Sequence, residues 1–212
     1  MVEIYDQDYF ERGIATGKSL YENYRWIPEL TIPLAMTYID LLGLEREHEI
    51  LDFGCAKGYV VKALRMLYRN AWGCDISHYA IEAADCDTKP FLKQSYYDKA
   101  VPFIRRFHWI IAKDVLEHIQ RENLQPLLVE LREFCQGMLV IVPLGECGKF
   151  NVPAYNLDTT HKIAESIYWW TDQFRDGGWE VKMAEYQCPG IKDSWASYDN
   201  GNGFFVMEKK NE

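Results

Sequence analysis

The hydrophobic positions of this chain alternate between short unbroken apolar runs, typical of buried parallel strands, and longer stretches with helical spacing. The first clear pair is an apolar run at residues 50–53 and a helical pattern at 59–67, with Gly54 and Gly58 between them. This pattern predicts a strand, a tight glycine turn and a helix. Such a turn places backbone N–H groups and the positive end of a helix dipole at the carboxyl edge of a parallel sheet, where open α/β folds bind ligands.

The same alternation continues to the end of the chain. Further strands are expected at residues 71–75, 91–95, 108–112, 138–142, 180–186 and 204–208, and helices at 31–42, 77–84, 126–134 and 163–174. For the helix at 31–42 we expect Thr31 as the cap, Pro33 in the first turn and Gly43 just beyond the end. Gly137 is expected to end the helix at 126–134.

Length and composition favour one domain. The chain has 212 residues, of which 48% are hydrophobic and 15% aromatic, enough for one substantial core. Within this single domain we expect an aromatic N-terminal lid at 1–45, a ligand-binding core at 46–142, and a substrate-facing rim with the sheet closure at 143–212.

The charge is acidic, with a formal net value of −9. A protein of this charge is not expected to bind nucleic acid or anionic membranes in general, because phosphate binding needs clustered Lys and Arg. The six cysteines are scattered without a C-x-x-C pair, so neither a zinc site nor a disulfide framework is suggested. With no apolar leader and no run long enough to cross a bilayer, we expect a cytoplasmic monomer or homodimer.

The glycine turn itself narrows the choice of ligand. A dinucleotide-binding turn has the form G-x-G-x-x-G, but here Ala56 takes the second glycine position and Tyr59 the last. The Walker pattern of nucleotide triphosphatases is absent as well. Both phosphate-binding interpretations are therefore weakened.

Two motifs instead resemble those of the class I S-adenosylmethionine-dependent methyltransferases. Asp52 ahead of Gly54-Cys55-Ala56-Lys57-Gly58 is similar to the first motif of that family, and Asp114-Val115-Leu116-Glu117-His118 is similar to the fourth. The resemblance spans residues 50–142, with a weaker match through 178. It implies S-adenosylmethionine as the cofactor and a Rossmann-like doubly wound α/β sheet, mostly parallel with an antiparallel C-terminal strand and helices on both faces.

The resemblance also suggests which residues bind the cofactor. Asp75, at the end of the second strand, is expected to accept hydrogen bonds from the ribose hydroxyls, with a solvated strand-end carboxylate as the alternative. Asp98 is a weaker candidate for an adenine contact. The N-terminal tyrosines either pack over the sheet edge or cover the cofactor. The expected cofactor-binding residues are Asp52, Gly54, Cys55, Ala56, Gly58, Asp75, Ile76, Asp98, Asp114, Val115 and Tyr24.

Two histidines are candidate catalytic groups, because an imidazole with a pKa near neutrality can act as a general base. His118 is the last residue of the fourth motif, where a role in hydrogen bonding of the turn itself is the alternative. His161 precedes a helical pattern at the place where related methyltransferases often carry a histidine, and capping of the loop is its alternative.

These features predict methyl transfer to an oxygen or nitrogen of a small molecule, with a sugar derivative or secondary metabolite as the favoured acceptor. Holding donor and acceptor in line in a dry pocket would supply most of the catalysis. Two other functions stay open. One is a non-catalytic protein that binds S-adenosylmethionine, and the other is a nicotinamide-dependent oxidoreductase, which the incomplete glycine pattern disfavours.

Overall fold

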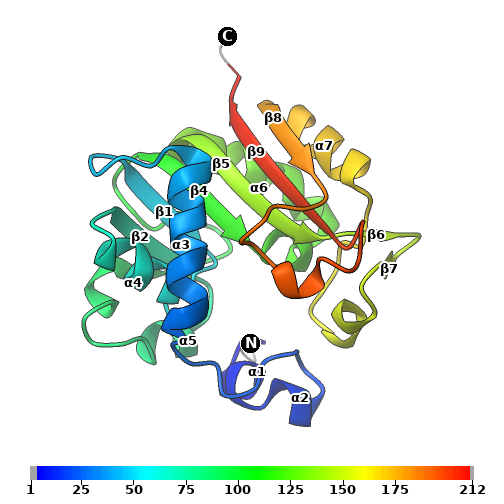
Figure 1. The fold of residues 1–212 in the computed structure, drawn as a ribbon, viewed down its shortest axis with the longest axis horizontal. Coiled ribbons are helices and arrows are strands. Elements are labelled where there is room, and N and C mark those ends of the chain that lie inside the picture. Colours follow the sequence, from blue (N-terminus) through cyan, green and yellow to red (C-terminus); the bar gives the residue numbers. More distant parts are fainter. Residues whose placement is uncertain (1–3, 211–212) are drawn as a thin grey trace. The chain divides into compact units, whose positions relative to one another are not determined.

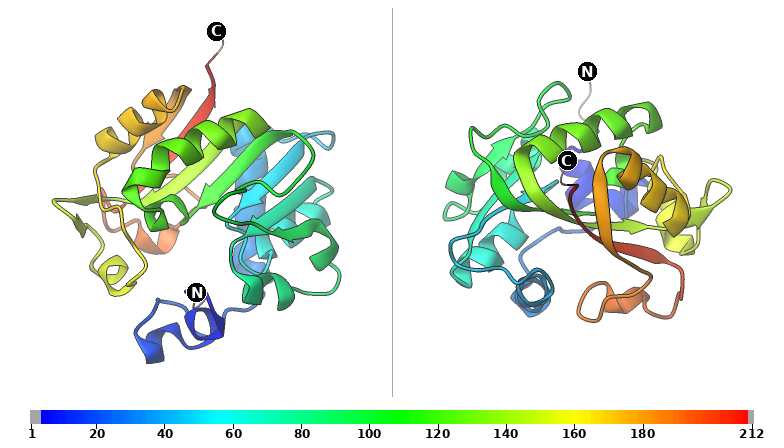
Figure 2. Two further views of the ribbon diagram at one scale, coloured as in Figure 1. Left: turned by 180° about the vertical axis from the view of Figure 1, so that it is seen from behind. Right: turned by 90° about the horizontal axis from the view of Figure 1, so that it is seen from above.

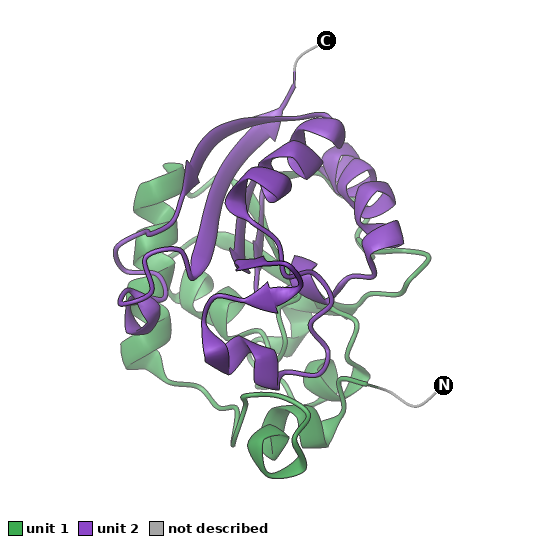
Figure 3. Cartoon of the chain, turned by 90° about the vertical axis from the view of Figure 1, so that its right-hand side faces the viewer, with its two compact units in different colours: residues 1–108 green, residues 109–212 purple. Residues whose placement is uncertain are grey.

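The computed structural model describes residues 4–210 of the chain. It divides into two compact units, residues 1–108 and 109–212 (Figure 3). Strand β4 (Phe107–Lys113) runs across the division. None of the described helices is both long enough and apolar enough to cross a bilayer.

Unit 1 is built on three parallel strands in the order β3-β2-β1 (Figure 1). The strands are β1 (Glu49–Phe53), β2 (Asn70–Asp75) and β3 (Leu92–Gln94). The helices are α1 (Gln7–Glu11), α2 (Gly13–Thr16), α3 (Pro28–Leu42), α4 (Tyr59–Met66) and α5 (His78–Glu82), with a 3-10 turn η1 at Lys89–Phe91.

Unit 2 is built on antiparallel pairing, with β9 hydrogen-bonded to both β5 and β8 (Figures 1 and 2). The strands are β5 (Cys135–Pro143), β8 (Trp179–Glu185), β9 (Asn202–Lys209) and a small hairpin of β6 (Gly145–Glu146) and β7 (Lys149–Phe150). The helices are α6 (Arg121–Phe134) and α7 (Ile167–Asp176), with 3-10 turns η2 (Leu116–His118), η3 (Pro153–Leu157) and η4 (Asp193–Trp195).

Each unit buries the apolar residues that the sequence pattern marks. In unit 1 the apolar face of α4 buries Val61, Ala63 and Leu64 completely. In unit 2 the ring of Phe174 on α7 stacks with Trp170 and meets Phe205 of β9 edge-on, with ring centroids 5.8 and 5.0 Å apart. Burial of such large rings is the main source of stability for elements of this size.

The elements confirm the predicted fold class, a Rossmann-like α/β arrangement that is mostly parallel and ends in antiparallel C-terminal strands. The expectation that Thr31 caps the first long helix was wrong. Helix α3 begins at Pro28, where the missing N–H costs nothing, and the Thr31 hydroxyl instead donates to the Ile27 carbonyl at 3.0 Å. Pro33 therefore lies inside α3 rather than in its first turn.

The expectation that Gly137 ends the sixth helix was also wrong. Helix α6 ends at Phe134, and Cys135 begins β5 without an intervening turn. Gly137 pairs with Glu208 inside the sheet, where a Cβ would lie 2.5 Å from the ring of Trp109. This glycine is required by the close approach of an indole ring, a reason that no local pattern reveals.

Candidate functional site

The glycine loop of unit 1 is held in shape by backbone hydrogen bonds. The amides of Gly54 and Cys55 both donate to the Cys74 carbonyl, at 2.8 and 3.0 Å, and Gly58 donates to the Cys55 carbonyl at 2.8 Å. Three loop residues have left-handed backbones, with φ values of 78° at Gly54, 49° at Ala56 and 77° at Gly58. The loop thus has the tight shape that the motif predicts.

Asp75 joins this loop to the turn after β2. The side chain is 9% exposed, and its two oxygens accept backbone hydrogen bonds from Ala56 at 2.7 Å and from Ser77 at 2.8 Å. Ser77 in turn caps α5 by accepting from the Ala80 amide at 2.9 Å. The Asp75 side chain therefore helps to hold the loop in shape, and its binding of a ribose stays a prediction.

A buried lysine ties the N-terminal segment to the same loop. Lys57 is 7% exposed, and its Nζ forms an ion pair with Glu11 and donates to the Tyr24 carbonyl at 2.8 Å. The Tyr79 hydroxyl also donates to Glu11, at 3.0 Å. Burial, together with the Glu11 carboxylate, raises the pKa of Tyr79 to about 12. This ion pair holds Tyr24, a predicted cofactor residue, beside the loop.

The N-terminal aromatic residues pack together around this link. Tyr9 and Phe10 are buried, and the half-buried residues that pack against them are Tyr5, Tyr21, Tyr24, Ala56 and Tyr79. The rings of Tyr24 and Tyr59 also stack, with centroids 5.3 Å apart. Packing, one of the two interpretations of these tyrosines, is thus present in the structure, and a covering role over the cofactor stays a prediction.

The other cofactor candidates of unit 1 lie in two different settings. Asp52 is buried in β1, and Ile76 is half-buried directly after β2. Cys55 is buried, and this burial, with the neighbouring Asp75 and Asp52 carboxylates, raises the pKa of its thiol. Asp98, by contrast, is exposed in a turn that paired hydrogen bonds between Tyr96 and Lys99 close.

In unit 2, Asp114 lies at the end of β4 with a left-handed backbone of φ 56°. Its amide donates to the Ile141 carbonyl at 2.9 Å, and its two carboxylate oxygens form ion pairs with Lys113 and Lys192. Burial acts to raise the pKa of Asp114, but the two lysines outweigh it and hold this pKa well below the usual range. Val115 follows as a half-buried residue before η2.

Lys192 connects Asp114 to a polar network. Its side chain is 6% exposed, and Nζ donates to the Asn202 amide oxygen at 2.8 Å and to the Tyr155 hydroxyl at 3.1 Å. The Tyr155 hydroxyl itself donates to Asn202 at 2.9 Å. Burial lowers the pKa of Lys192, while the Asp114 carboxylate opposes that change.

Glu117, three residues after Asp114, has very different surroundings. It is completely buried, and within residues 4–210 neither carboxylate oxygen has a hydrogen-bond partner. One oxygen lies 3.9 Å from Nε2 of His118. Burial, followed by repulsion from Asp114, raises the pKa of Glu117.

The two candidate catalytic histidines lie together, with ring centroids 4.7 Å apart. Nδ1 of His161 donates to the Tyr155 carbonyl at 2.7 Å. Nδ1 of His118 is 2.8 Å from the Thr160 hydroxyl, whose proton goes to Asp158 at 2.5 Å, so this Nδ1 is the donor. In both neutral rings the proton is therefore on Nδ1, and Nε2 carries the lone pair.

Burial favours the neutral form of both rings. It lowers the pKa of His118 to about 4, with repulsion from His161 as the second cause, and it also lowers the pKa of His161. The structure thus brings together both histidines that the sequence marks, with their orientation fixed by the loop at 155–160.

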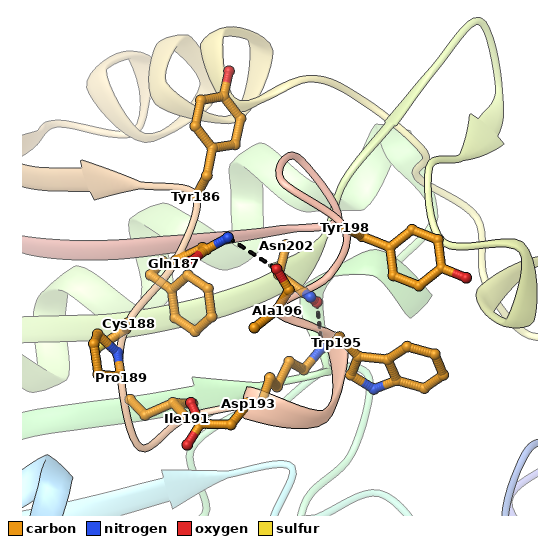
Figure 4. Close-up of a pocket in the computed structure, with 12 residues that line it drawn as sticks. Tyr186, Gln187, Cys188, Pro189, Ile191, Asp193, Trp195, Ala196, Tyr198 and Asn202 are labelled. Atoms are coloured by element: carbon orange, nitrogen blue, oxygen red, sulfur yellow. Dashed lines mark hydrogen bonds between the residues drawn. The ribbon is translucent and has the colours of Figure 1, made fainter.

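A small pocket of about 200 Å³ lies in the loop between β8 and β9 (Figure 4). Its lining includes Tyr186, Trp195, Tyr198 and the network residues Lys192 and Asn202. The loop is closed by a hydrogen bond from the Gln187 amide to the Ala196 carbonyl at 3.1 Å (Figure 4). Aromatic walls with a buried cation suit a ligand that has both a flat apolar part and hydrogen-bonding groups.

Sequence reasoning missed residues of the Lys57 network in unit 1 and of the Lys192 and histidine network in unit 2: Glu11, Lys57, Tyr79, Tyr155, Thr160, Lys192 and Asn202. Lys57 stands inside the glycine motif and could have been singled out there. Each of the other residues has at least one partner 40 or more positions away along the chain, and no motif marks it.

A family model described as a methyltransferase domain matches residues 30–195. None of the curated proteins compared with the chain matches its sequence significantly.

Solved structures with a similar fold are numerous. One is a complex between the Haloferax volcanii Trm112 methyltransferase activator and a candidate methyltransferase, with a TM-score of 0.68, 16% identity, and coverage of 87% of this chain and 92% of that one. Another is an S-adenosylmethionine-dependent methyltransferase from Clostridium acetobutylicum, with a TM-score of 0.63, 11% identity, and coverage of 87% and 93%. At such low identities the likeness shows the fold alone.

Proposed function

Because the chain belongs to the methyltransferase-domain family, whose cofactor is S-adenosylmethionine, we propose that it moves a methyl group from that cofactor to an oxygen or nitrogen of a small-molecule acceptor. The single observation that carries the proposal is the pair of neutral, oriented histidines in unit 2. Each ring has a fixed Nδ1–H and an Nε2 lone pair.

Methyl transfer from a sulfonium is an in-line displacement, in which the acceptor lone pair forms a bond to the methyl carbon as the carbon–sulfur bond breaks. Positioning lowers most of the barrier. The acceptor proton must also leave, and His161 and His118 have lone pairs that would assist its removal from a hydroxyl or ammonium group. Burial lowers the pKa of both rings and so favours the unprotonated form of those lone pairs.

The proposed acceptor is small. The net charge of −9 disfavours a polyanionic acceptor, and the pocket beside Lys192 has the size of a small polar molecule. A sugar derivative or a secondary metabolite with a hydroxyl or amino group fits these requirements. The glycine loop, with Asp52, Asp75, Asp114, Val115 and Tyr24, is proposed to bind the cofactor.

A methylation assay with a panel of such acceptors tests the proposal, with release of S-adenosylhomocysteine as the readout. His161→Asn should reduce turnover at least tenfold while the affinity for S-adenosylmethionine changes less than twofold. Unchanged turnover in this variant would assign His161 to loop capping. Cofactor binding without turnover on any acceptor would favour the non-catalytic binding protein.

A further inference from the structure

Glu117, His118 and His161 form a compact set of metal-ligating atoms in unit 2. One ligand atom from each of the three side chains lies within 4.8 Å of the other two. Two ligands of one ion, each about 2.1 Å from it, are about 3.0–3.6 Å apart at tetrahedral or octahedral angles. Side-chain movement on the order of 1 Å would therefore close this set around an ion.

The buried carboxylate supplies an independent reason to expect a cation. Glu117 is completely buried, and no hydrogen bond to either carboxylate oxygen is present within residues 4–210. A buried carboxylate without donors is costly, and proteins usually satisfy such a group with hydrogen bonds, an opposite charge or a metal ion. Lys113 and Lys192 form ion pairs with the neighbouring Asp114, whereas Glu117 forms no ion pair with a lysine among the described residues.

The histidines already have the orientation of metal ligands. A ligating imidazole usually donates its other ring N–H to a carbonyl or to a group that leads to a carboxylate. His161 donates Nδ1–H to the Tyr155 carbonyl, and His118 donates to Thr160, whose hydroxyl donates to Asp158. Both Nε2 atoms are then the nitrogens with a lone pair.

We propose that Glu117, His118 and His161 bind one divalent transition-metal ion through the carboxylate and the two Nε2 atoms. Two imidazoles and one carboxylate suit Mn²⁺, Fe²⁺, Co²⁺ or Zn²⁺ better than Mg²⁺, which prefers oxygen ligands. Three protein ligands leave coordination positions open for another molecule.

The role of this ion rests on the proposed function, although binding itself does not. A hydroxyl of the acceptor that occupies an open position would lose its proton more easily, because a bound cation stabilises the alkoxide. The histidines would then assist methyl transfer as ligands. The fixed tautomers of His118 and His161 leave the lone pair on Nε2, which suits metal binding as well as general-base catalysis.

Titration of the metal-free full-length chain with MnCl₂ tests the site, with free Mn²⁺ measured by electron paramagnetic resonance. Mn²⁺ is the probe because Cys86 and Cys147 are exposed thiols that would compete for Zn²⁺ or Co²⁺. We expect one equivalent to bind in the absence of cofactor and acceptor. Glu117→Gln and His161→Asn should each weaken binding at least tenfold, and the control His78→Gln, at an exposed histidine, should not.

No saturable binding of Mn²⁺ to the wild-type chain, or wild-type affinity in both variants, would overturn the proposal. Circular dichroism of each variant shows whether it is folded, and the wild-type result does not depend on any variant. Mn²⁺ binding without methyl transfer would contradict the proposed function alone. Methyl transfer without Mn²⁺ binding would contradict the metal site alone.

Discussion

Asp114, half-buried directly after β4, and Glu117, completely buried three residues later, have pKa values that are shifted in opposite directions. Lys113 and Lys192 hold the pKa of Asp114 low, whereas burial and the charge of Asp114 raise the pKa of Glu117. A second negative charge at Glu117 therefore needs a partner of its own. A bound cation, as in the proposed metal site, would supply that partner and favour the deprotonated carboxylate.

Removal of one partner of the ion pair between Asp114 and Lys192 should destabilise the protein, even where the intact pair adds little net stability. Asp114→Asn tests the charge, because asparagine has nearly the same size and tolerates the left-handed backbone of φ 56°. We expect the free energy of unfolding at pH 7 to fall by about 3 kcal/mol, because Lys192 stays buried without its counter-charge. Urea denaturation of both proteins measures the difference.

The same substitution should change the pH dependence of stability. The pKa of folded Asp114 lies below the unfolded value, so its stabilisation is complete above the unfolded pKa of about 4 and is lost as the pH falls through the folded pKa. The gap between wild type and Asp114→Asn should thus be constant from pH 7 to 5 and shrink below pH 4. A double-mutant cycle with Lys192→Met is the control, and additive effects would show that the two residues are not coupled.

At the scale of elements, the sequence predicts those strands, turns and helices that are determined by residues close together along the chain. The pattern at residues 50–67 gives β1, the glycine loop and α4 almost to the residue, because strand, turn and helix each have a local signature. The histidines were found for a similar reason, since His118 ends the fourth motif and His161 directly precedes a helical pattern. Helix α3 begins three residues earlier than expected because Pro28 is as good a start as Thr31.

Contacts between distant segments could not be predicted in this way. The Lys57 side chain reaches Glu11 across 46 positions, and His118 reaches Thr160 across 42. Each pair forms only because the fold brings two distant segments together. The positions of Lys57 and Thr160 belong to no hydrophobic pattern that could have marked them. The missed part of the candidate site is therefore its supporting shell, which orients the groups that the motifs reveal.

Gly58 is the N-cap residue of α4, and its substitution should disturb the whole loop. An added Cβ would lie 2.6 Å from Cδ1 of Leu92, and the backbone has φ 77°. We expect Gly58→Ala to lower the free energy of unfolding by about 2–4 kcal/mol, from the left-handed strain of about 1 kcal/mol plus the clash. Affinity for S-adenosylmethionine should fall in the same variant.

Gly43→Ala is the matched control for that prediction. Gly43 also has a left-handed backbone, with φ 57°, but none of the residues that the structure describes has an atom within 4 Å of an added Cβ. Gly43→Ala should therefore lower the free energy of unfolding only by the left-handed strain of about 1 kcal/mol. Equal losses in the two variants, measured by urea denaturation, would show that contact with Leu92 is unimportant.

At the scale of the whole molecule, each unit has its own buried charged network. Unit 1 has Lys57 with Glu11 beside the glycine loop, and unit 2 has Asp114 with Lys192 beside the histidine pair. Charged groups of this kind cost free energy to bury and are kept where they position something.

Cofactor binding should stabilise the complete chain in a way that identifies the cofactor. A ligand at one hundred times its dissociation constant adds about 2.7 kcal/mol, which is roughly 5–10 °C in the melting temperature of a protein of this size. We expect such a shift with S-adenosylmethionine and S-adenosylhomocysteine and none with NAD.

Asp75→Ala should abolish most of this shift, because the substitution removes the predicted ribose acceptor and leaves the Ala56 and Ser77 amides without their acceptor. The control Asp40→Ala, at an exposed carboxylate, should keep the shift. A shift with NAD alone would instead favour the oxidoreductase, and a full shift in Asp75→Ala would limit this residue to holding the loop.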